Sequence, residues 1–228
     1  MVTIKELLKY SQEQDLAHIP SALSHLDLLN YLYFNKIIDP LNDNLIIGKP
    51  FGAQSYYLIW KKLGLLENIE KLSYGVKHNE IPFVDFSEET LGNALGVGIG
   101  ICLANNKLTW VHLSDGAFQM GPTLEALQFL RKVKIPLIIT VDANDYQLTG
   151  TTKEVMNIDA FDILNITNSF GLNSKFIDKD YRVINESLRK TKEPLVLVFK
   201  TKKGNGIPEM ELDPIKWHYK KLEEGEFL

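Results

Sequence analysis

The chain has 228 residues, of which 45% are hydrophobic and 24% charged, and its formal net charge is −4. This composition is typical of a globular protein, and a chain of this length can bury a sizeable core without disulfides or structural metal. The acidic balance, with only three arginines, argues against a nucleic-acid-binding surface. The single cysteine, Cys102, excludes a disulfide framework and a cysteine-based zinc site. No apolar run is long enough to span a bilayer and the N-terminus is not a signal peptide, so we expect a cytoplasmic protein without a membrane partner.

The first hundred residues are predicted to be mostly helical. Apolar residues recur at helical spacing over residues 4–12, 21–34 and 51–63. We expect Ser21 to cap the second of these helices and Gly64 to end the third.

A run of glycines follows. Gly92, Gly96 and Gly100 are spaced four residues apart, which would put them on one face of a helix. Such a smooth face lets another backbone approach closely. The sequence leaves open whether that backbone belongs to the same fold or to a neighbouring subunit.

Three buried strands are predicted after residue 100, over residues 108–113, 136–141 and 195–200. Their apolar character is continuous rather than alternating, which indicates strands of a parallel sheet covered on both faces. Residues 122–133, between the first two strands, show helical spacing and have a proline in the first turn. The sequence therefore predicts an α/β fold containing a right-handed βαβ unit.

Polar residues follow two of these strands directly. Asp115 and Gly116 come after the first, and residues 142–145 come after the second. Because the carboxyl ends of neighbouring parallel strands lie at one edge of a sheet, we expect Asp115 and Asn144 to meet there. Carboxylate and amide oxygens suit Mg²⁺ or Ca²⁺, and Gly116 would let a diphosphate approach the backbone.

The wider pattern resembles the thiamine-diphosphate signature of the transketolase family. Residues 113–121, then Glu125-Ala, then residues 141–150 are similar to the family's GDG element, its helix containing Glu-Ala, and its D-x-N-x-x-Q-x-x-G loop. Further family elements are matched in the same order by residues 17–34, 43–65, 82–92, 200–206 and 217–218. The resemblance covers about residues 13–221 and implies a three-layer thiamine-diphosphate-binding fold, with a mostly parallel central sheet flanked by helices.

The resemblance implies a role for each matching residue. Asp115 and Asn144 would bind Mg²⁺ or Ca²⁺ through their side chains, and Tyr146 would bind it through its backbone carbonyl. Asp115 and Gly116 would also face the diphosphate of the cofactor. Leu91 would pack against the pyrimidine ring of the cofactor.

Two histidines would act on the substrate in the same comparison. His18 would reach the reacting sugar, and His218 would lie near both the diphosphate and the reacting carbon, where an imidazole can donate a hydrogen bond or exchange a proton. His25 and His112 match no functional position, and we expect them to be structural. His78 aligns with the family only through a gap and is better explained as a loop residue.

The chain departs from the family mainly in the substrate half. Phe51 stands where the family's SKGH element has histidine, and Met120 where it has glutamate. Glu88 and Glu89 replace a Thr-Gly pair that normally lies against the cofactor. The residues expected to bind the metal and the diphosphate match the family better. The departures in the substrate half put ordinary pentose-phosphate substrates in doubt.

The family also needs a glutamate from a pyrimidine-binding domain, which activates the cofactor. We expect residues 1–228 to form a single diphosphate- and Mg²⁺-binding domain, with that second domain on a separate C-terminal transketolase-like subunit, in a heterotetramer. The resemblance implies transfer of a two-carbon ketol unit between sugars or sugar phosphates. Two alternatives remain open: one component of a thiamine-diphosphate-dependent 2-oxo acid decarboxylase or acyloin-type transferase, and a catalytically silent scaffold of the same fold.

Overall fold

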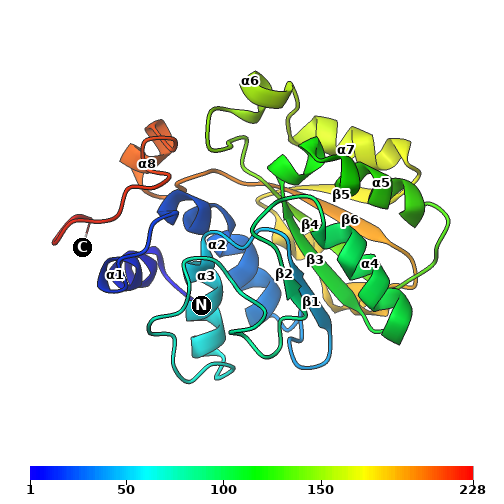
Figure 1. The fold of residues 1–228 in the computed structure, drawn as a ribbon, viewed down its shortest axis with the longest axis horizontal. Coiled ribbons are helices and arrows are strands. Elements are labelled where there is room, and N and C mark those ends of the chain that lie inside the picture. Colours follow the sequence, from blue (N-terminus) through cyan, green and yellow to red (C-terminus); the bar gives the residue numbers. More distant parts are fainter. Residues whose placement is uncertain (228) are drawn as a thin grey trace.

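A six-stranded, all-parallel sheet forms the centre of the computed structural model, which describes residues 1–227 (Figure 1). Its strand order is β2-β1-β3-β4-β6-β5. The strands are β1 (Asn44–Ile47), β2 (Phe86–Ser87), β3 (Thr109–Ser114), β4 (Leu137–Ala143), β5 (Asn173–Asp178) and β6 (Leu195–Lys200).

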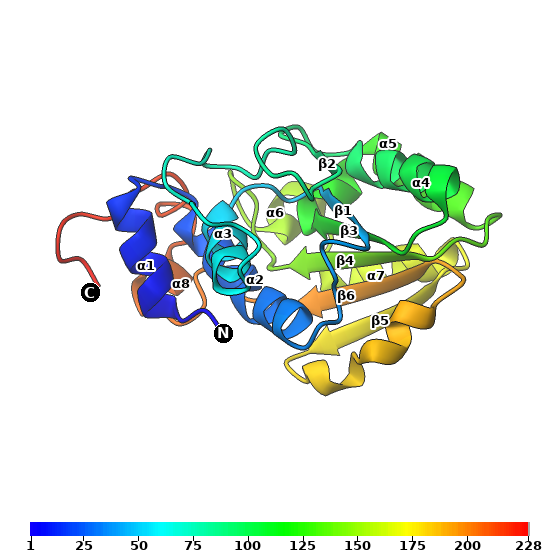
Figure 2. The same cartoon turned by 90° about the horizontal axis from the view of Figure 1, so that it is seen from below.

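Helices cover both faces of the sheet and complete three layers (Figure 2). Helices α2 and α3 pack on one face, with α1 packed against them, and α4, α5 and α7 lie on the other face. The helices are α1 (Ile4–Glu13), α2 (Ile19–Phe34), α3 (Ala53–Lys62), α4 (Ala94–Asn105), α5 (Gly121–Leu130), α6 (Thr152–Met156), α7 (Ala160–Ser169) and α8 (Pro208–Leu212), with 3-10 turns η1 (Asp115–Gln119), η2 (Tyr181–Val183) and η3 (Glu186–Lys190). Across residues 1–227, no helix is both long and apolar enough to cross a membrane.

Two hydrophobic cores explain the continuous apolar strands. Neighbouring residues of a strand point to opposite faces, so Trp110 joins the core under α1–α3 while Val111 joins the core under α4, α5 and α7. The same alternation separates Leu197 from Val198 in β6. Because both faces are buried, both sets of positions are mostly apolar.

The three predicted strands are confirmed to within two residues as β3, β4 and β6, and the predicted βαβ unit is confirmed, with β3 and β4 paired in parallel around α5. Strands β1, β2 and β5 are not predicted from the sequence. Two of these, β1 and β2, have only four and two residues. The edge strand β5 is mostly exposed and has a polar composition.

The predicted cap of the second helix is wrong. Helix α2 begins at Ile19, and its N-cap is His18, whose backbone is left-handed with φ 60°. Pro20 can occupy the first helical turn because no hydrogen bond of the helix needs its missing N–H. Ser21 therefore lies inside the helix. Helix α3 does end before a left-handed Gly64 (φ 72°), as expected.

The glycine face is also different from the prediction. Gly92 precedes α4 and is outside the helix. The glycine that packs closely is Gly98, where an added Cβ would lie 2.6 Å from Val111 Cγ2 of β3. Gly96 and Gly100 point away from the sheet, and a Cβ on either would meet no atom within 4 Å.

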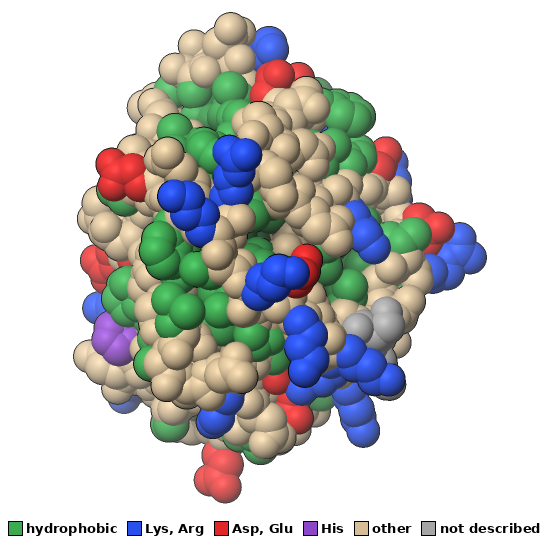
Figure 3. Space-filling model, turned by 90° about the vertical axis from the view of Figure 1, so that its right-hand side faces the viewer, with side chains coloured by type: hydrophobic (Ala, Val, Ile, Leu, Met, Phe, Trp, Pro, Cys, Tyr) green, Lys and Arg blue, Asp and Glu red, His purple; other side chains and the backbone are tan. Residues whose placement is uncertain are grey.

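The two ends of the chain lie beside each other, next to the carboxyl ends of the strands. Figure 2 shows α1, α8 and the C-terminal segment on the side toward which the arrows of β4, β5 and β6 point. Lys221 forms an ion pair with Asp15 across the two segments. The opposite end of the sheet is seen in Figure 3, where Lys and Arg side chains gather on one part of the surface and hydrophobic side chains form small separate patches.

Candidate active site

Asp115 joins the ends of two neighbouring strands. It follows β3 and begins η1, and its Oδ1 accepts a hydrogen bond from the backbone N–H of Gly116 (2.8 Å). Its Oδ2 accepts hydrogen bonds from the backbone N–H groups of Asn144 (3.1 Å) and Asp145 (3.0 Å), which follow β4. The carboxylate thus fixes the loop that carries Asn144, as the parallel arrangement of the strands predicts.

The environment of Asp115 favours a bound cation. The side chain is buried, and burial together with the nearby charge of Asp142 raises the pKa of Asp115 to about 7. A cation beside the carboxylate would offset both effects. Because the residue is held by backbone donors rather than by a lysine or arginine, its charge is available to such a cation.

The amide of Asn144 has a defined orientation. Its Nδ2 donates to Asp142 Oδ2 (3.0 Å) and to Ser24 Oγ (3.3 Å), while its Oδ1 accepts from the backbone N–H of Tyr146 (3.1 Å). Within residues 1–227 no group of three or more His, Cys, Asp or Glu side chains could hold a metal. A site made of one carboxylate, one amide oxygen and a backbone carbonyl suits Mg²⁺, which usually keeps several waters or phosphate oxygens as ligands.

A cavity of about 390 Å³ opens at this edge of the sheet. All seven residues for which the sequence predicted a site role line it: His18, Leu91, Asp115, Gly116, Asn144, Tyr146 and His218. They come from the start of α2, the loop before α4, the ends of β3 and β4, and the C-terminal segment. Segments far apart in the sequence thus form one site.

One end of the cavity suits an anion that approaches the backbone. An added Cβ on Gly116 would lie 3.2 Å from Leu91 Cδ1 and 3.8 Å from Gln147 Nε2, so a side chain there would crowd the cavity. Lys203 lies close by, with its ammonium 3.2 Å from both the Gln147 carbonyl and His218 Nδ1. Lys203 is only 3% exposed, and burial lowers its pKa to about 8. No role for this lysine is predicted from the sequence.

The other end of the cavity is aromatic. The ring of His18 stacks on Phe51, with the centroids 4.9 Å apart and the planes at 16°, and Phe51 in turn stacks on Tyr74 at 5.7 Å. The edges of His218 and Tyr219 face the same imidazole at 4.9 and 5.1 Å. The sequence marks Phe51 as a departure from the family, but no pattern in it points to Tyr74 or Tyr219.

Both cavity histidines are neutral at pH 7. Burial and the positive charge of Lys203 lower the pKa of His18 to about 4 and that of His218 to about 3. His18 Nδ1 is buried and has no hydrogen-bond partner among the described residues. A neutral imidazole with an unsatisfied nitrogen is suited to a hydrogen bond with a ligand hydroxyl.

The remaining three histidines do not line this cavity. His25 and His112 are buried beneath it, where they contact each other and, through His25, the ammonium of Lys49. His78 is exposed at the surface, where it stacks on Phe86.

The two glutamates that replace the family's Thr-Gly pair have different environments. Glu88 lies outside the cavity lining, and its carboxylate accepts hydrogen bonds from the backbone at the start of α4. Glu89 lines the cavity and lies 3.7 Å from Lys77 Nζ. Met120 is the N-cap residue of α5. It packs against Gly92, where an added Cβ would lie 2.9 Å from the Cβ of Met120.

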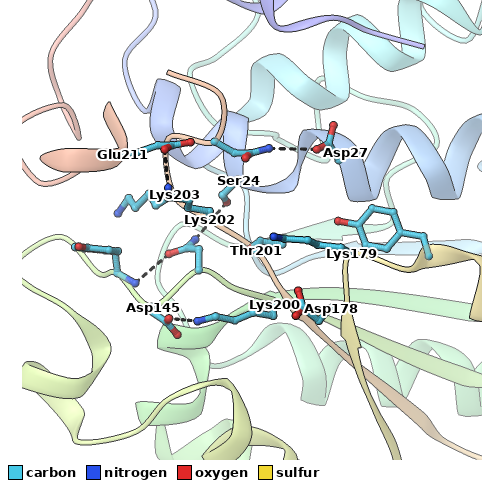
Figure 4. A pocket seen from close by; sticks show the side chains of 14 residues that line it. Ser24, Asp27, Asp145, Asp178, Lys179, Lys200, Thr201, Lys202, Lys203 and Glu211 are labelled. Carbon is cyan, nitrogen blue, oxygen red and sulfur yellow. Dashed lines mark hydrogen bonds and ion pairs between the residues drawn. The ribbon is translucent and has the colours of Figure 1, made fainter. Parts of the chain in front are cut away.

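A second cavity, of about 710 Å³, lies on the other side of the loop that carries Asn144 (Figure 4). Its charges are balanced, with four lysines and four acidic residues among the residues that line it. Several are already paired, as in the ion pairs of Lys200 with Asp145 and of Lys202 with Glu211. It is larger than the first cavity, but it has no net charge to select an ionic ligand.

Two bacterial proteins are similar to this chain over most of their length, and both are named as one subunit of apulose-4-phosphate transketolase. The protein of Actinobacillus succinogenes is 30% identical over 230 residues, which cover 89% of this chain and 82% of that protein. The protein of Phocaeicola vulgatus is 25% identical over 245 residues, which cover 94% and 85%. Transketolase-like protein 2 of Homo sapiens is 25% identical over 89% of this chain, but the match covers only 36% of that protein.

Solved transketolases share the fold. The transketolase of Campylobacter jejuni superposes with a TM-score of 0.74 at 20% identity, over 94% of this chain and 39% of that chain. A transketolase of Pichia stipitis gives 0.72 at 19% identity, over 89% and 36%. The present chain therefore spans well under half of these structures. No protein-family model matches the sequence.

Proposed function

This chain belongs to the transketolase family, and from this we propose that it is the diphosphate-binding subunit of a two-subunit, thiamine-diphosphate-dependent transketolase-like enzyme. The observation that carries the proposal is the gathering of all seven predicted site residues around one cavity. A division into two subunits is supported by the two bacterial relatives, each named as one subunit of its enzyme, of which this chain covers 82% and 85%.

The residues at the sheet edge fit the proposed cofactor and metal. Asp115, Asn144 and the carbonyl of Tyr146 would hold Mg²⁺, since they supply hard oxygen ligands and the buried Asp115 carboxylate is held by backbone N–H groups. Gly116 leaves room for a diphosphate, and Lys203 supplies a buried positive charge. When bound, thiamine diphosphate supplies the nucleophilic carbon that carries a two-carbon unit from a ketose to an aldehyde.

The chain's own residues would orient the sugar and exclude water. His18 offers an unpaired, buried Nδ1 that can hydrogen-bond to a substrate hydroxyl, and it is held in place by the rings that surround it. His218 faces Lys203 on one side and His18 on the other. Because its Nδ1 accepts from the Lys203 ammonium, its Nε2 carries the proton and can donate a hydrogen bond to a ligand. The stacked rings of Phe51 and Tyr74 form an apolar wall at this end of the cavity.

We further propose that residues 1–228 are one diphosphate- and Mg²⁺-binding domain. A separate C-terminal transketolase-like subunit would contribute the pyrimidine-binding domain, in a heterotetramer. The substrate would be a sugar or a sugar phosphate. The relatives named for apulose 4-phosphate support a substrate other than the common pentose phosphates, as does the aromatic residue at position 51.

Reconstitution with the partner tests the proposal. The chain is purified from its native extract, the stoichiometric partner is identified by mass spectrometry, and the complex is assayed with ketose and 2-oxo acid donors, thiamine diphosphate and Mg²⁺. We expect transfer from a ketose and a loss of at least about 100-fold in Asp115→Asn. Asp27→Asn is the matched control, because Asp27 lines the second cavity and is hydrogen-bonded to Asn205.

Three outcomes would contradict the proposal. Turnover of 2-oxo acids alone would change the reaction class, and unchanged activity in Asp115→Asn would remove the metal site. Isolation of the chain without a partner would favour a catalytically silent scaffold.

A further inference from the structure

A buried lysine lies behind the proposed metal site. Lys49 is only 6% exposed, and its ammonium is surrounded by hydrogen-bond acceptors. It lies 3.0 Å from the Ser21 carbonyl, 3.1 Å from Ser24 Oγ and 3.3 Å from His25 Nδ1, and it forms an ion pair with Asp142. An ammonium has three protons, so these acceptors are enough to use all of them. Lys49 is therefore fixed within this network.

Two neighbouring histidines, His25 and His112, continue the hydrogen-bond network around Lys49. His25 Nε2 lies 3.2 Å from the Gly52 carbonyl, which can only accept, so the proton is on Nε2 and Nδ1 is free to accept from Lys49. His112 is next in the network, with Nδ1 2.8 Å from Thr140 Oγ1. Burial and the charge of Lys49 lower the pKa of both histidines, which favours their neutral forms.

The partner of Lys49 is a fully buried carboxylate. Asp142 Oδ2 accepts hydrogen bonds from Lys49, from Ser24 Oγ (2.6 Å) and from Asn144 Nδ2 (3.0 Å), and its Oδ1 accepts from Thr201. Each of these partners donates to Asp142: an ammonium, two hydroxyls and an amide nitrogen. Asp142 therefore accepts every one of these hydrogen bonds.

This hydrogen-bond pattern determines how the amide of Asn144 is turned. Because Asp142 accepts, the amide nitrogen of Asn144 faces it, and the amide oxygen faces the backbone N–H of Tyr146, the residue whose carbonyl is the third proposed metal ligand. We propose that Lys49 and Asp142 are positioning residues, which hold the amide oxygen of Asn144 toward the bound metal. The inference rests on the proposed function, since it assumes a metal at Asp115 and Asn144.

Electrostatics and positioning predict opposite results when Lys49 is removed. The positive charge of Lys49 is close enough to Asp115 to lower its pKa, so by Coulomb interaction alone it also opposes a cation there. If charge were its only effect, Lys49→Met would bind the metal more tightly. If Lys49 acts by fixing Asp142 and Asn144, the same substitution weakens metal binding. The sign of the change in affinity separates the two explanations.

A direct measurement of metal binding gives the sign of this change in affinity. Mn²⁺, as a paramagnetic substitute for Mg²⁺, is titrated into the reconstituted complex with thiamine diphosphate, and free Mn²⁺ is measured by electron paramagnetic resonance. We expect Lys49→Met to raise the Mn²⁺ dissociation constant about tenfold, the usual effect of losing the support of a metal ligand. Ser24→Ala keeps both charges and removes the hydroxyl that donates to Asp142 and accepts from Lys49 and Asn144, and we expect it to raise the constant a few-fold.

A second ion pair supplies the control. Arg189 and Asp43 form a partly buried pair at 2.6 Å, and Arg189 does not line the cavity. Arg189→Met should lower the melting temperature but leave the Mn²⁺ dissociation constant unchanged. Equal or tighter binding in both Lys49→Met and Ser24→Ala would overturn the positioning role while leaving the proposed function intact. No Mn²⁺ binding by the reconstituted wild-type complex with thiamine diphosphate would contradict the proposed function itself, and the inference with it.

Discussion

The backbone N–H of His18 donates a hydrogen bond to the carbonyl oxygen of His218 at 3.1 Å, and the two imidazole rings are 4.9 Å apart. This contact joins the start of α2 to the C-terminal segment. Each histidine is therefore placed by the backbone of the other's segment, as well as by its own packing. The aromatic end of the cavity depends on both segments being in place.

The burial of His18 predicts a loss of stability in acid. Its pKa is lowered to about 4 in the folded protein and is about 6.5 in the unfolded chain. Between these values the unfolded state binds a proton that the folded state does not. The free energy of unfolding is therefore unaffected by His18 above pH 6.5 and falls as the pH approaches 4. By about pH 5 the loss caused by His18 is about 2 kcal/mol, at about 1.4 kcal/mol per pH unit.

Urea unfolding at about pH 7.5 and about pH 5 measures this effect. Between the two pH values we expect the free energy of unfolding of His18→Asn to fall by about 2 kcal/mol less than that of the wild type, because the variant has no imidazole to protonate at this position. Asparagine is chosen because it tolerates the left-handed backbone there. His78→Asn is the control, because His78 is exposed and outside the cavity. The burial argument fails if His18→Asn and the wild type lose equal stability.

Glu88 is predicted to stabilise the start of α4. Its carboxylate is 7% exposed and accepts hydrogen bonds from the backbone N–H groups of Gly92 (3.2 Å), Asn93 (2.8 Å) and Ala94 (2.9 Å). These groups have no partner within the helix, and negative charge is favourable at a helix N-terminus. We expect Glu88→Ala to lower the free energy of unfolding by about 2 kcal/mol, measured by denaturant titration.

The adjacent glutamate tests whether position or charge matters. Glu89 pairs only at the surface with Lys77, so Glu89→Ala should change stability by less than about 0.5 kcal/mol. A similar cost for the two substitutions would show that Glu88 acts through the net charge of the loop rather than as a cap.

The parts of the fold that sequence predicts are those governed by local pattern. Strands β3, β4 and β6 are continuous apolar segments, and parallel pairing alone then brings Asp115 and Asn144 to one edge. Family motifs identified the histidines of the cavity. Polar edge strand β5 has no comparable pattern, and the cap at His18 depends on the proline that follows it.

The residues that support the site could not be predicted in the same way. Lys49 and Asp142 are 93 positions apart, and a lysine in a loop is normally solvated. Only the folded sheet brings its ammonium into contact with that carboxylate. Tyr74 and Tyr219 likewise join the wall around His18 from loops without regular spacing. Such contacts depend on tertiary packing rather than on any local signal.

The contact of α4 with the sheet predicts opposite effects at neighbouring glycines. In Gly98→Ala the new Cβ would lie 2.6 Å from Val111 Cγ2, so we expect the free energy of unfolding to fall by about 1–3 kcal/mol. In Gly96→Ala and Gly100→Ala the Cβ meets open space, and alanine favours the helix by about 0.5–1 kcal/mol. Denaturant titration of the isolated chain measures all three, and a loss of stability in Gly96→Ala would contradict this packing. If the outer face of α4 contacts a partner subunit, both outer variants would weaken assembly while the isolated chain remains stable.

The aromatic wall predicts that Phe51 selects the substrate. A histidine at this position can still stack on His18 and Tyr74, but it adds a hydrogen-bonding nitrogen to an apolar end of the cavity. We therefore expect Phe51→His in the reconstituted complex to raise kcat/KM for pentose-phosphate donors about tenfold, because hydrogen bonds to substrate hydroxyls discriminate strongly. The change should lie mainly in KM, with little effect on the melting temperature.

The control for Phe51 is a second stacked phenylalanine. Phe161 is stacked on Phe176 at 4.3 Å and does not line the cavity, so Phe161→His should leave kcat/KM for every donor unchanged. Phe51→Leu removes the ring without adding a polar atom, and should lower kcat/KM for all donors, since His18 then loses the ring on which it stacks. Equal donor preferences in Phe51→His and the wild type would mean that the aromatic wall supports His18 without discriminating between donor sugars, and that specificity is determined by the partner subunit.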